Sequence, residues 1–151
     1  MKNPAVIRLV NAQVSGITDA TTTRAIYSGL QCYDSIVFLI NVTAAGTATG
    51  TVNLYIQDSW DNGTTWDDMV SSAQLTLGST TGTQRFVIQG RIATTITQAS
   101  AVSNAALSAG TVRSGPFGDR IRVLEKVAGT SGSPVGATYT ITMIPGRSED
   151  N

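Results

Sequence analysis

The chain has 151 residues, enough for one domain with its own core but too few for a second domain of ordinary size. Ten acidic and ten basic side chains give a formal charge of zero, and only 13% of the residues are charged, against about 25% in an average protein. Nucleic acid and anionic membranes are therefore not expected as partners, because both are bound chiefly by concentrated positive charge.

Short runs rich in Val, Ile, Thr, Tyr and Phe recur along the chain, bounded by Gly, Asn, Asp, Ser and Pro, as is typical of β-strands. We predict nine strands, near residues 5–14, 22–27, 35–42, 50–57, 65–70, 73–77, 84–89, 120–127 and 137–144. The sequence therefore predicts an all-β fold, an antiparallel β-sandwich or jelly roll of about eight to nine strands with an extended N-terminal arm.

The first 18 residues are interpreted as an N-terminal arm or a first strand, and residues 19–151 as a single β-sandwich domain. The apolar segment AVIRLV supplies candidate partner contacts, namely Val6, Ile7, Leu9 and Val10. If it is an arm, we expect it to contact a neighbouring subunit. Deletion of residues 1–14 should then leave the domain folded but abolish its binding to the particle that contains that subunit. The alternative is that AVIRLV is simply the first strand of the sandwich.

The amino terminus, MKNPAVIRLV, lacks the apolar run of a signal peptide, and no segment approaches the roughly 20 apolar residues of a membrane span. We therefore expect synthesis in the cytoplasm. The single cysteine, Cys32, lies in LQCYDSIVFL and is expected to be a buried, inert thiol at a strand edge.

Two strand patterns indicate which residues face the core. In TVNLYIQDS, Val52, Leu54 and Ile56 alternate with Asn53, Tyr55 and Gln57, so one face packs and the other is wetter. The run SIVFLINV is apolar on both faces, which indicates a central strand covered on both sides or a strand that meets a partner chain. In DRIRVLEKV, we expect a polar face that carries Arg120 and Arg122, with Glu125 as a further candidate.

The most specific motif is SWDNGTTW, in which five residues fit the pattern S-x-D-x-G-x-T-W: Ser59, Asp61, Gly63, Thr65 and Trp66. It resembles the Asp-box of sialidases, which implies several boxes at the periphery of propeller blades, away from the catalytic centre. This chain has one box and no repeat, so we interpret the motif as a structural hairpin. Asp61 is expected to accept bonds from N–H groups two residues on, and Trp66 to cover the turn.

Metal binding and catalysis are not supported by the remaining motifs. Asp58, Asp61, Asp67 and Asp68 lie close together, but their spacing does not match a calcium loop, so we interpret them as solvated carboxylates at the hairpin base. The chain has no histidine, which removes Ser-His-Asp and Cys-His machinery, and it has no phosphate-binding fingerprint. We therefore predict no catalytic residue, no metal and no cofactor, and expect no hydrolysis of a sialoside reporter.

The stretch between Arg91 and Gly115 is rich in Ala, Ser and Thr and is less readable. It is interpreted as a strand followed by a short helix near residues 103–108, or as a long ordered loop. Residues 99–110 are expected to form either a contact loop or an ordinary packed connection.

Three segments together resemble the small β-sandwich structural proteins of tailed bacteriophages: residues 57–66, residues 115–122 in GPFGDRIR, and residues 139–145. Head decoration, or cement, proteins fit best in size. The resemblance implies a protein of the virion that binds the outer capsid surface, with partners that are copies of itself, as a homotrimer, and the major capsid protein. It implies neither nucleic-acid nor membrane binding.

Two alternatives stay open. One is a tail or fibre-associated virion protein. The other is a carbohydrate-binding β-sandwich module, in which Trp60 and Tyr55 would present aromatic faces to a sugar. Trp60 occupies an x position of the motif, so its ring is expected to be exposed and is a candidate partner contact.

Overall fold

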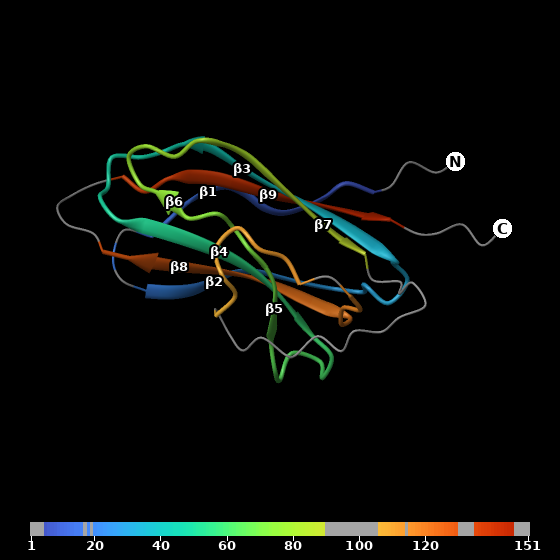
Figure 1. Cartoon of the computed structure of the whole chain (residues 1–151). Helices are drawn as coiled ribbons and strands as arrows, with labels where there is room; N and C mark the ends of the chain where they lie inside the picture. Colours follow the sequence, from blue (N-terminus) through green and yellow to red (C-terminus); the bar gives the residue numbers. More distant parts are fainter. Residues whose placement is uncertain are drawn as a thin grey trace.

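The computed structural model describes residues 5–16, 18, 20–89, 106–113, 115–129 and 135–146, and within them the chain forms nine strands and no helix. The strands are β1 (Ile7–Val14), β2 (Ala20–Ser28), β3 (Ser35–Ala44), β4 (Thr51–Ser59), β5 (Asp67–Ser71), β6 (Leu75–Thr76), β7 (Gly82–Gln89), β8 (Arg120–Ala128) and β9 (Thr138–Gly146). They lie in two antiparallel layers (Figure 1), which confirms the predicted β-sandwich.

All nine predicted strands are present, and their predicted bounds differ from the observed ones by two residues or fewer. The shortest is β6, because the chain turns directly after it. There the carbonyl oxygen of Thr76 accepts bonds from the N–H groups of Ser79 and Thr80. Residues 103–105 of the helix considered near residues 103–108 lie outside the described residues, and residues 106–108 are not helical.

Consecutive strands change sheets at most steps along the chain. The four-stranded sheet has the order β1-β9-β3-β7, and the five-stranded sheet has the order β2-β8-β4-β5, with β6 also paired to β4. Only the link from β4 to β5 is a hairpin between adjacent strands of the same sheet among the described residues. Most strand neighbours are therefore far apart in sequence, so the core needs nearly the whole chain to form.

The N-terminal segment enters the sandwich as an edge strand. β1 pairs with β9, and Val10 lies in the core at 6% exposed, while Ile7 and Leu9 pack partly against the core. The first-strand alternative therefore describes residues 7–14, and Val10 is not available as a surface contact. Deletion of residues 1–14 would remove β1, including the core residue Val10, and would leave the outer edge of β9 unpaired, so the truncated domain is not expected to remain intact.

Strand alternation sends one apolar row from each sheet into a shared core. On β3 these residues are Ile36, Phe38, Ile40 and Val42; on β4 they are Val52, Leu54 and Ile56; on β9 they are Tyr139, Ile141 and Met143. Each is 2% exposed or less, and burial of such a side chain contributes about 1.5–3 kcal/mol relative to leaving it in water.

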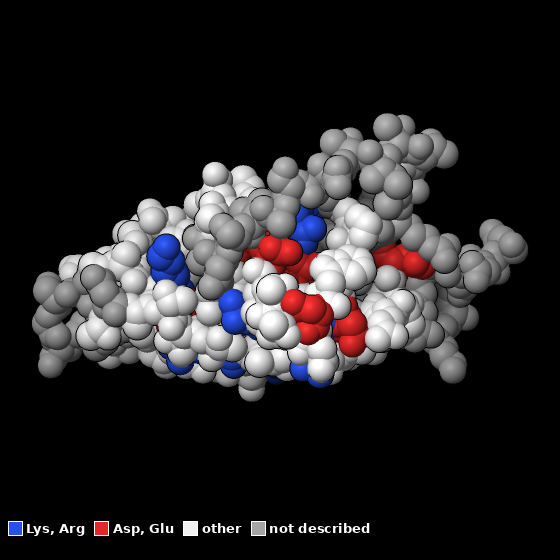
Figure 2. All heavy atoms as spheres, turned by 90° about the horizontal axis from the view of Figure 1, so that it is seen from below, with Lys and Arg blue, Asp and Glu red and all other residues white. Residues whose placement is uncertain are grey.

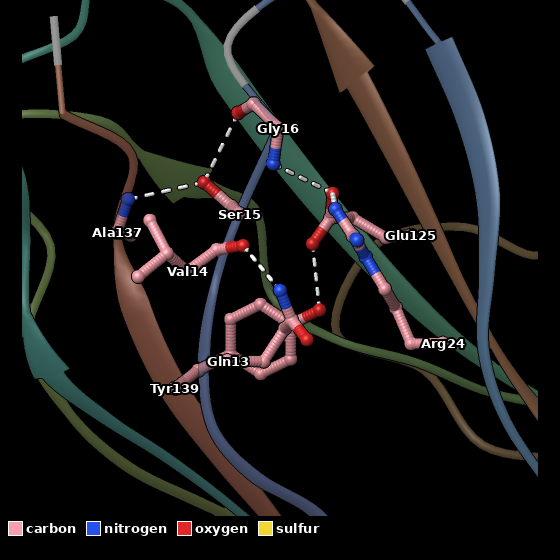
Figure 3. A network of polar contacts seen from close by, with 8 residues as sticks. All are labelled: Gln13, Val14, Ser15, Gly16, Arg24, Glu125, Ala137 and Tyr139. Atoms are coloured by element: carbon pink, nitrogen blue, oxygen red, sulfur yellow. Dashed lines mark hydrogen bonds and ion pairs between the residues drawn. The ribbon is translucent and has the colours of Figure 1, made fainter.

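One charged group also points inward between the sheets. Glu125 of β8 is 1% exposed, and Figure 3 shows it between Arg24 and Tyr139. Its carboxylate accepts bonds from Arg24 Nη2 at 2.6 Å, from the Gly16 N–H at 2.8 Å and from the Tyr139 hydroxyl at 2.6 Å. Burial raises the pKa of the Tyr139 hydroxyl well above its ordinary value, and Glu125 raises it further.

The structure therefore corrects the placement of Glu125. Arg120 and Arg122 do face outward, but Glu125 is an odd number of residues away and strand alternation turns it into the core. It joins β8 to β9 across the sandwich and to β2 beside it. The β1–β2 link is held next to this cluster, because the Ser15 N–H donates to the Ala137 carbonyl oxygen, the Ala137 N–H donates to Ser15 Oγ, and the Gly16 N–H donates to Glu125.

We predict that Glu125→Ala lowers the free energy of unfolding by about 3 kcal/mol. The change leaves the Arg24 cation and the Tyr139 hydroxyl without their shared acceptor, and breaking a buried ion pair costs about 3–5 kcal/mol. Arg24 keeps 20% of its side chain exposed, which favours the lower end of that range. Urea unfolding measures the loss. Lys126→Ala, on the exposed neighbouring position, serves as control and should change stability by less than about 0.5 kcal/mol; equal losses would contradict the assignment.

Candidate functional site

The hairpin between β4 and β5, residues 59–66, is the best-defined surface feature of the described chain, and we call it the hairpin clamp. Its turn uses two residues with positive φ, Asn62 at 60° and Gly63 at 94°. Asparagine and glycine are the residues that tolerate this backbone region, so the sequence favours the turn locally. Figure 1 shows the hairpin projecting away from the four-stranded sheet.

Asp61 organises the hairpin clamp through its carboxylate. Oδ1 accepts bonds from the Ser59 hydroxyl at 2.8 Å and from the N–H groups of Thr64 at 3.0 Å and Thr65 at 2.8 Å, while Oδ2 accepts from the Thr65 hydroxyl at 2.7 Å. The prediction that Asp61 accepts a bond from the N–H two residues on was wrong. Asp61 accepts bonds from the N–H groups three and four residues on. The N–H of Gly63, two residues on, donates to Ser59 Oγ instead.

These donors favour the ionised carboxylate of Asp61. The bonds from Thr65, first its N–H and then its hydroxyl, lower the pKa of Asp61 from 3.8 to about 2. Asp61 therefore carries a full negative charge at all physiological pH values, on an exposed hairpin that contains no Lys or Arg between residues 59 and 68.

Trp66 covers the turn, as predicted. Its Nε1 donates to the Gly63 carbonyl oxygen at 3.0 Å, and its ring lies 4.6 Å from the guanidinium carbon of Arg122, measured to the ring centroid. A Cβ at Gly63 would stand 3.3 Å from the Trp66 ring, so the absence of a side chain there also makes the close contact possible. The cation–π contact connects the hairpin to β8.

Two buried carboxylates lie at the base of the hairpin clamp. Asp58 and Asp68 are both 0% exposed, so the expectation that they are solvated was wrong. Asp58 accepts bonds from Arg113 Nη2 at 2.6 Å and from the Gly118 N–H at 2.9 Å. Burial raises the pKa of Asp58, while Gly118 and Arg113 act in the opposite direction.

Asp68 uses its carboxylate to hold a distant segment. It accepts bonds from Gln57 Nε2 at 2.5 Å and from the N–H groups of Ala106 at 2.7 Å and Leu107 at 2.9 Å. Gln57 in turn accepts a bond from Arg122 Nε at 2.6 Å. Side chains from β8, β4 and β5 therefore form one hydrogen-bonded series across the outer face of the five-stranded sheet.

The carboxylates of this region are engaged by protein donors rather than grouped for a cation. Among the described residues, no cluster of three or more His, Cys, Asp or Glu side chains is arranged to hold a metal. Figure 2, which views the side from which the hairpin projects, shows acidic side chains near the middle of that face with Lys and Arg side chains beside them. Asp68 and Asp58 therefore act as anchors for residues 106–118.

The segment GPFG closes the hairpin clamp from the other side. A Cβ at Gly118 would lie 2.0 Å from the Ser59 carbonyl oxygen, so only glycine allows this loop to approach the end of β4. Arg113 adds a bond from its Nε to the Asp68 carbonyl oxygen at 3.0 Å, and Val112 forms a β-bridge with Val70 at the edge of β5. None of these contacts was predicted, because their partners are 38 or more residues apart.

Trp60 is displayed by this rigid base. It is 64% exposed, as expected from its x position in the motif, whereas Trp66 is partly buried. Tyr55 is 6% exposed and cannot present its ring beside Trp60, which corrects the expectation of a two-aromatic sugar platform. Cys32 is exposed, not buried, with its sulfur 4.0 Å from the Gly29 carbonyl oxygen.

The depressed pKa of Asp61 predicts how the hairpin clamp responds to acid. A carboxylate whose pKa is lowered by folding stabilises the hairpin fully above its ordinary pKa, and that contribution is lost as the pH falls from about 4 to about 2. An NMR titration of the Asp61 carboxyl carbon should have its midpoint near pH 2. Thr65→Val removes one donor and should raise the midpoint, while a wild-type midpoint near 3.8 would contradict the geometry.

The described part of the chain contains no helix that is long and apolar enough to cross a membrane. Comparison of the chain with protein-family models, with curated proteins and with solved structures finds no match. The function must therefore be argued from the residues, the hairpin clamp and its exposed tryptophan.

Proposed function

We propose that the chain is a structural virion protein, a capsid decoration protein that binds the outside of a tailed-phage head and stabilises it through protein–protein contacts. The observation that carries the proposal is the hairpin clamp, which holds Trp60 in water at 64% exposure on a base in which the Asp61 carboxylate accepts four hydrogen bonds. Such a base limits the conformational entropy that binding would cost.

The segments that resemble phage structural proteins support this proposal, because two of them meet at the hairpin clamp. Residues 57–66 supply the hairpin, and residues 115–122 supply Gly118, which binds Asp58, and Arg122, which stacks on Trp66. The third segment, residues 139–145, lies in β9 and is tied to the other sheet by Tyr139 and Glu125. The segments that carry the resemblance therefore include residues whose contacts hold the hairpin clamp and β9 in place.

An exposed tryptophan on a rigid loop suits a protein contact. Tryptophan is enriched among the few interface residues that carry most of the binding energy. A low-charge, hydroxyl-rich surface is compatible with extensive contact to copies of the same chain, which we propose form a homotrimer, and to a major capsid protein. The protein acts in this proposal by binding, without a catalytic residue or a cofactor.

The same tryptophan is also the observation that favours a second candidate, a carbohydrate-binding module. A single exposed ring can stack on a sugar, but the burial of Tyr55 leaves Trp60 without the aromatic neighbour that this interpretation used. A tail or fibre-associated virion protein would use the hairpin clamp in the same way as a head protein. Location in the particle separates the virion candidates.

We predict that the protein is found on the heads of particles released from cells that carry its gene, with labelling by a specific antibody in electron micrographs as the measurement. Trp60→Ala should reduce rebinding to stripped heads about 30-fold, because a tryptophan anchor contributes about 2 kcal/mol or more. Val135→Ala, at a valine that is 59% exposed outside the hairpin clamp, is the matched control.

Other locations would decide against the head proposal. Label confined to tails would favour the tail candidate, and particles without label would exclude a virion role. Binding of an immobilised glycan that Trp60→Ala abolishes would favour the carbohydrate module. Equal rebinding of Trp60→Ala and wild type would show that the hairpin clamp is not the contact.

A further inference from the structure

The outer face of the four-stranded sheet carries a row of four aliphatic side chains. Val37 of β3 lies between Val87 of β7 and Ile144 of β9, its direct partners on the two sides. Extending the β1–β9 register by one residue places Val6 beside Ile144. We call these four residues the aliphatic row, and at a strand spacing of about 4.8 Å it spans about 14 Å.

The aliphatic row is open to solvent. Val6 is 69% exposed and Val87 is 48% exposed, while Val37 and Ile144 are half-buried by their neighbours. The run SIVFLINV is apolar on both faces for this reason: its even-numbered residues fill the core, and its odd-numbered residues form the centre of the outer face. Aliphatic side chains aligned across a whole sheet indicate a contact surface rather than scattered apolar residues.

Arginine is the only charged residue type on the strands of this sheet. The row of side chains next to the aliphatic row has Leu39 at its centre and an exposed arginine on each edge strand, Arg85 on β7 and Arg8 on β1. None of β1, β3, β7 and β9 contains an Asp or Glu. The face therefore fits a partner with an apolar centre and negative charge beside it.

The hairpin clamp of the same chain has that chemistry. Trp60 supplies an exposed apolar ring, Asp61 next to it is exposed and ionised, and the segment from 59 to 68 has no positive side chain. The two surfaces cannot meet within one molecule, since Figure 1 shows the hairpin projecting from the layer opposite the four-stranded sheet. Contact between them requires two copies.

We infer that the hairpin clamp of one copy docks on the aliphatic row of a second copy, with the Trp60 ring against Val37 and Val87 and Asp61 toward Arg85. The contact uses different surfaces on the two partners, so each copy can donate its hairpin and accept another. Such a contact closes into a ring if the rotation between copies allows it and otherwise forms an open chain.

Pairing of two aliphatic rows face to face is disfavoured by charge. It would bring Arg8 and Arg85 of both copies into one interface to which these strands contribute no carboxylate. Like charges juxtaposed at an interface cost several kcal/mol. The hairpin clamp instead brings a carboxylate to the arginines.

The inference deepens the proposed function, because it names a second copy as the partner of Trp60, and it is tested in solution without phage heads. Failure of self-association would therefore leave head binding open, and failure of head binding would leave self-association open. The change on the acceptor side is Val87→Asp, the change on the donor side is Trp60→Ala, and Val135→Asp is the matched control at another exposed valine.

We predict that light scattering shows the wild-type mass rising above one chain between about 10 μM and about 1 mM. Val87→Asp and Trp60→Ala should each lower the association constant at least about tenfold, and Val135→Asp should leave it unchanged. All three positions are exposed, and urea unfolding checks that the variants fold; Arg85→Glu provides a second acceptor variant with the same expected loss.

Mixing the two defective variants is the decisive measurement. Trp60→Ala keeps an intact aliphatic row and Val87→Asp keeps an intact hairpin clamp, so an equimolar mixture should form pairs with wild-type affinity that do not grow beyond two chains. A mixture no heavier than its separate components would overturn the inference. A wild type that stays at the mass of one chain at about 1 mM, or variants that associate as wild type does, would overturn it as well.

Discussion

The shape of the surface around the hairpin clamp depends on two carboxylates that the fold buries at the base of the hairpin and that need hydrogen-bond donors. Asp58 and Asp68 are fully removed from water, and a buried charge is tolerated only where donors surround it. Gln57 supplies one donor, and the others come from Ala106, Leu107, Arg113 and Gly118, which these bonds tie to the ends of β4 and β5. Polar contacts thus help to position residues 106–118, together with the packing of Phe117 against the core.

That arrangement explains why the hairpin clamp can be both exposed and rigid. The interior of the turn is saturated by Asp61 and Ser59, its base by Asp58 and Asp68, and its flank by Arg122 against Trp66. Each contact removes motion that would otherwise be lost on binding, so in the proposed function Trp60 would meet its partner with most of the ordering already done. A hairpin that resembles the Asp-box of sialidases therefore acts here as a structural support.

The strands could be predicted from the sequence, but the polar contacts could not. Alternation in TVNLYIQDS identifies Val52, Leu54 and Ile56 as core, since that signal is local and depends only on period two. The burial of Tyr55 and Asp68 on the opposite face depends on what covers that face, which no local pattern reports. Asp68 is bound by residues 38 and 39 positions away, and its sequence context reads as an ordinary solvated turn.

Burial of charge follows the same logic at Glu125, where alternation alone should have placed the side chain in the core. We predicted an outward position because an isolated carboxylate is unfavourable in a core. Arg24 and Tyr139 compensate for the buried charge, but the sequence does not show that β2, β8 and β9 bring these side chains together. For Val10 the prediction was wrong in the opposite direction. Its apolar segment was a candidate surface contact, yet pairing of β1 with β9 gives it a place in the core.

The edges of the sandwich indicate how copies of the chain can meet. β1 pairs with register shifts on either side of Val10 and has Ala12 at a φ of 46°, β2 has a shift before Ala25, and β5 is covered by the bridge to Val112. Bulges and covering segments oppose edge-to-edge pairing of strands. β7 has a continuous register, but Arg85 lies on it, and a charge on an edge strand also opposes such pairing. Contact between copies is therefore expected to use side chains on faces and hairpins, which is where Trp60 and the aliphatic row lie.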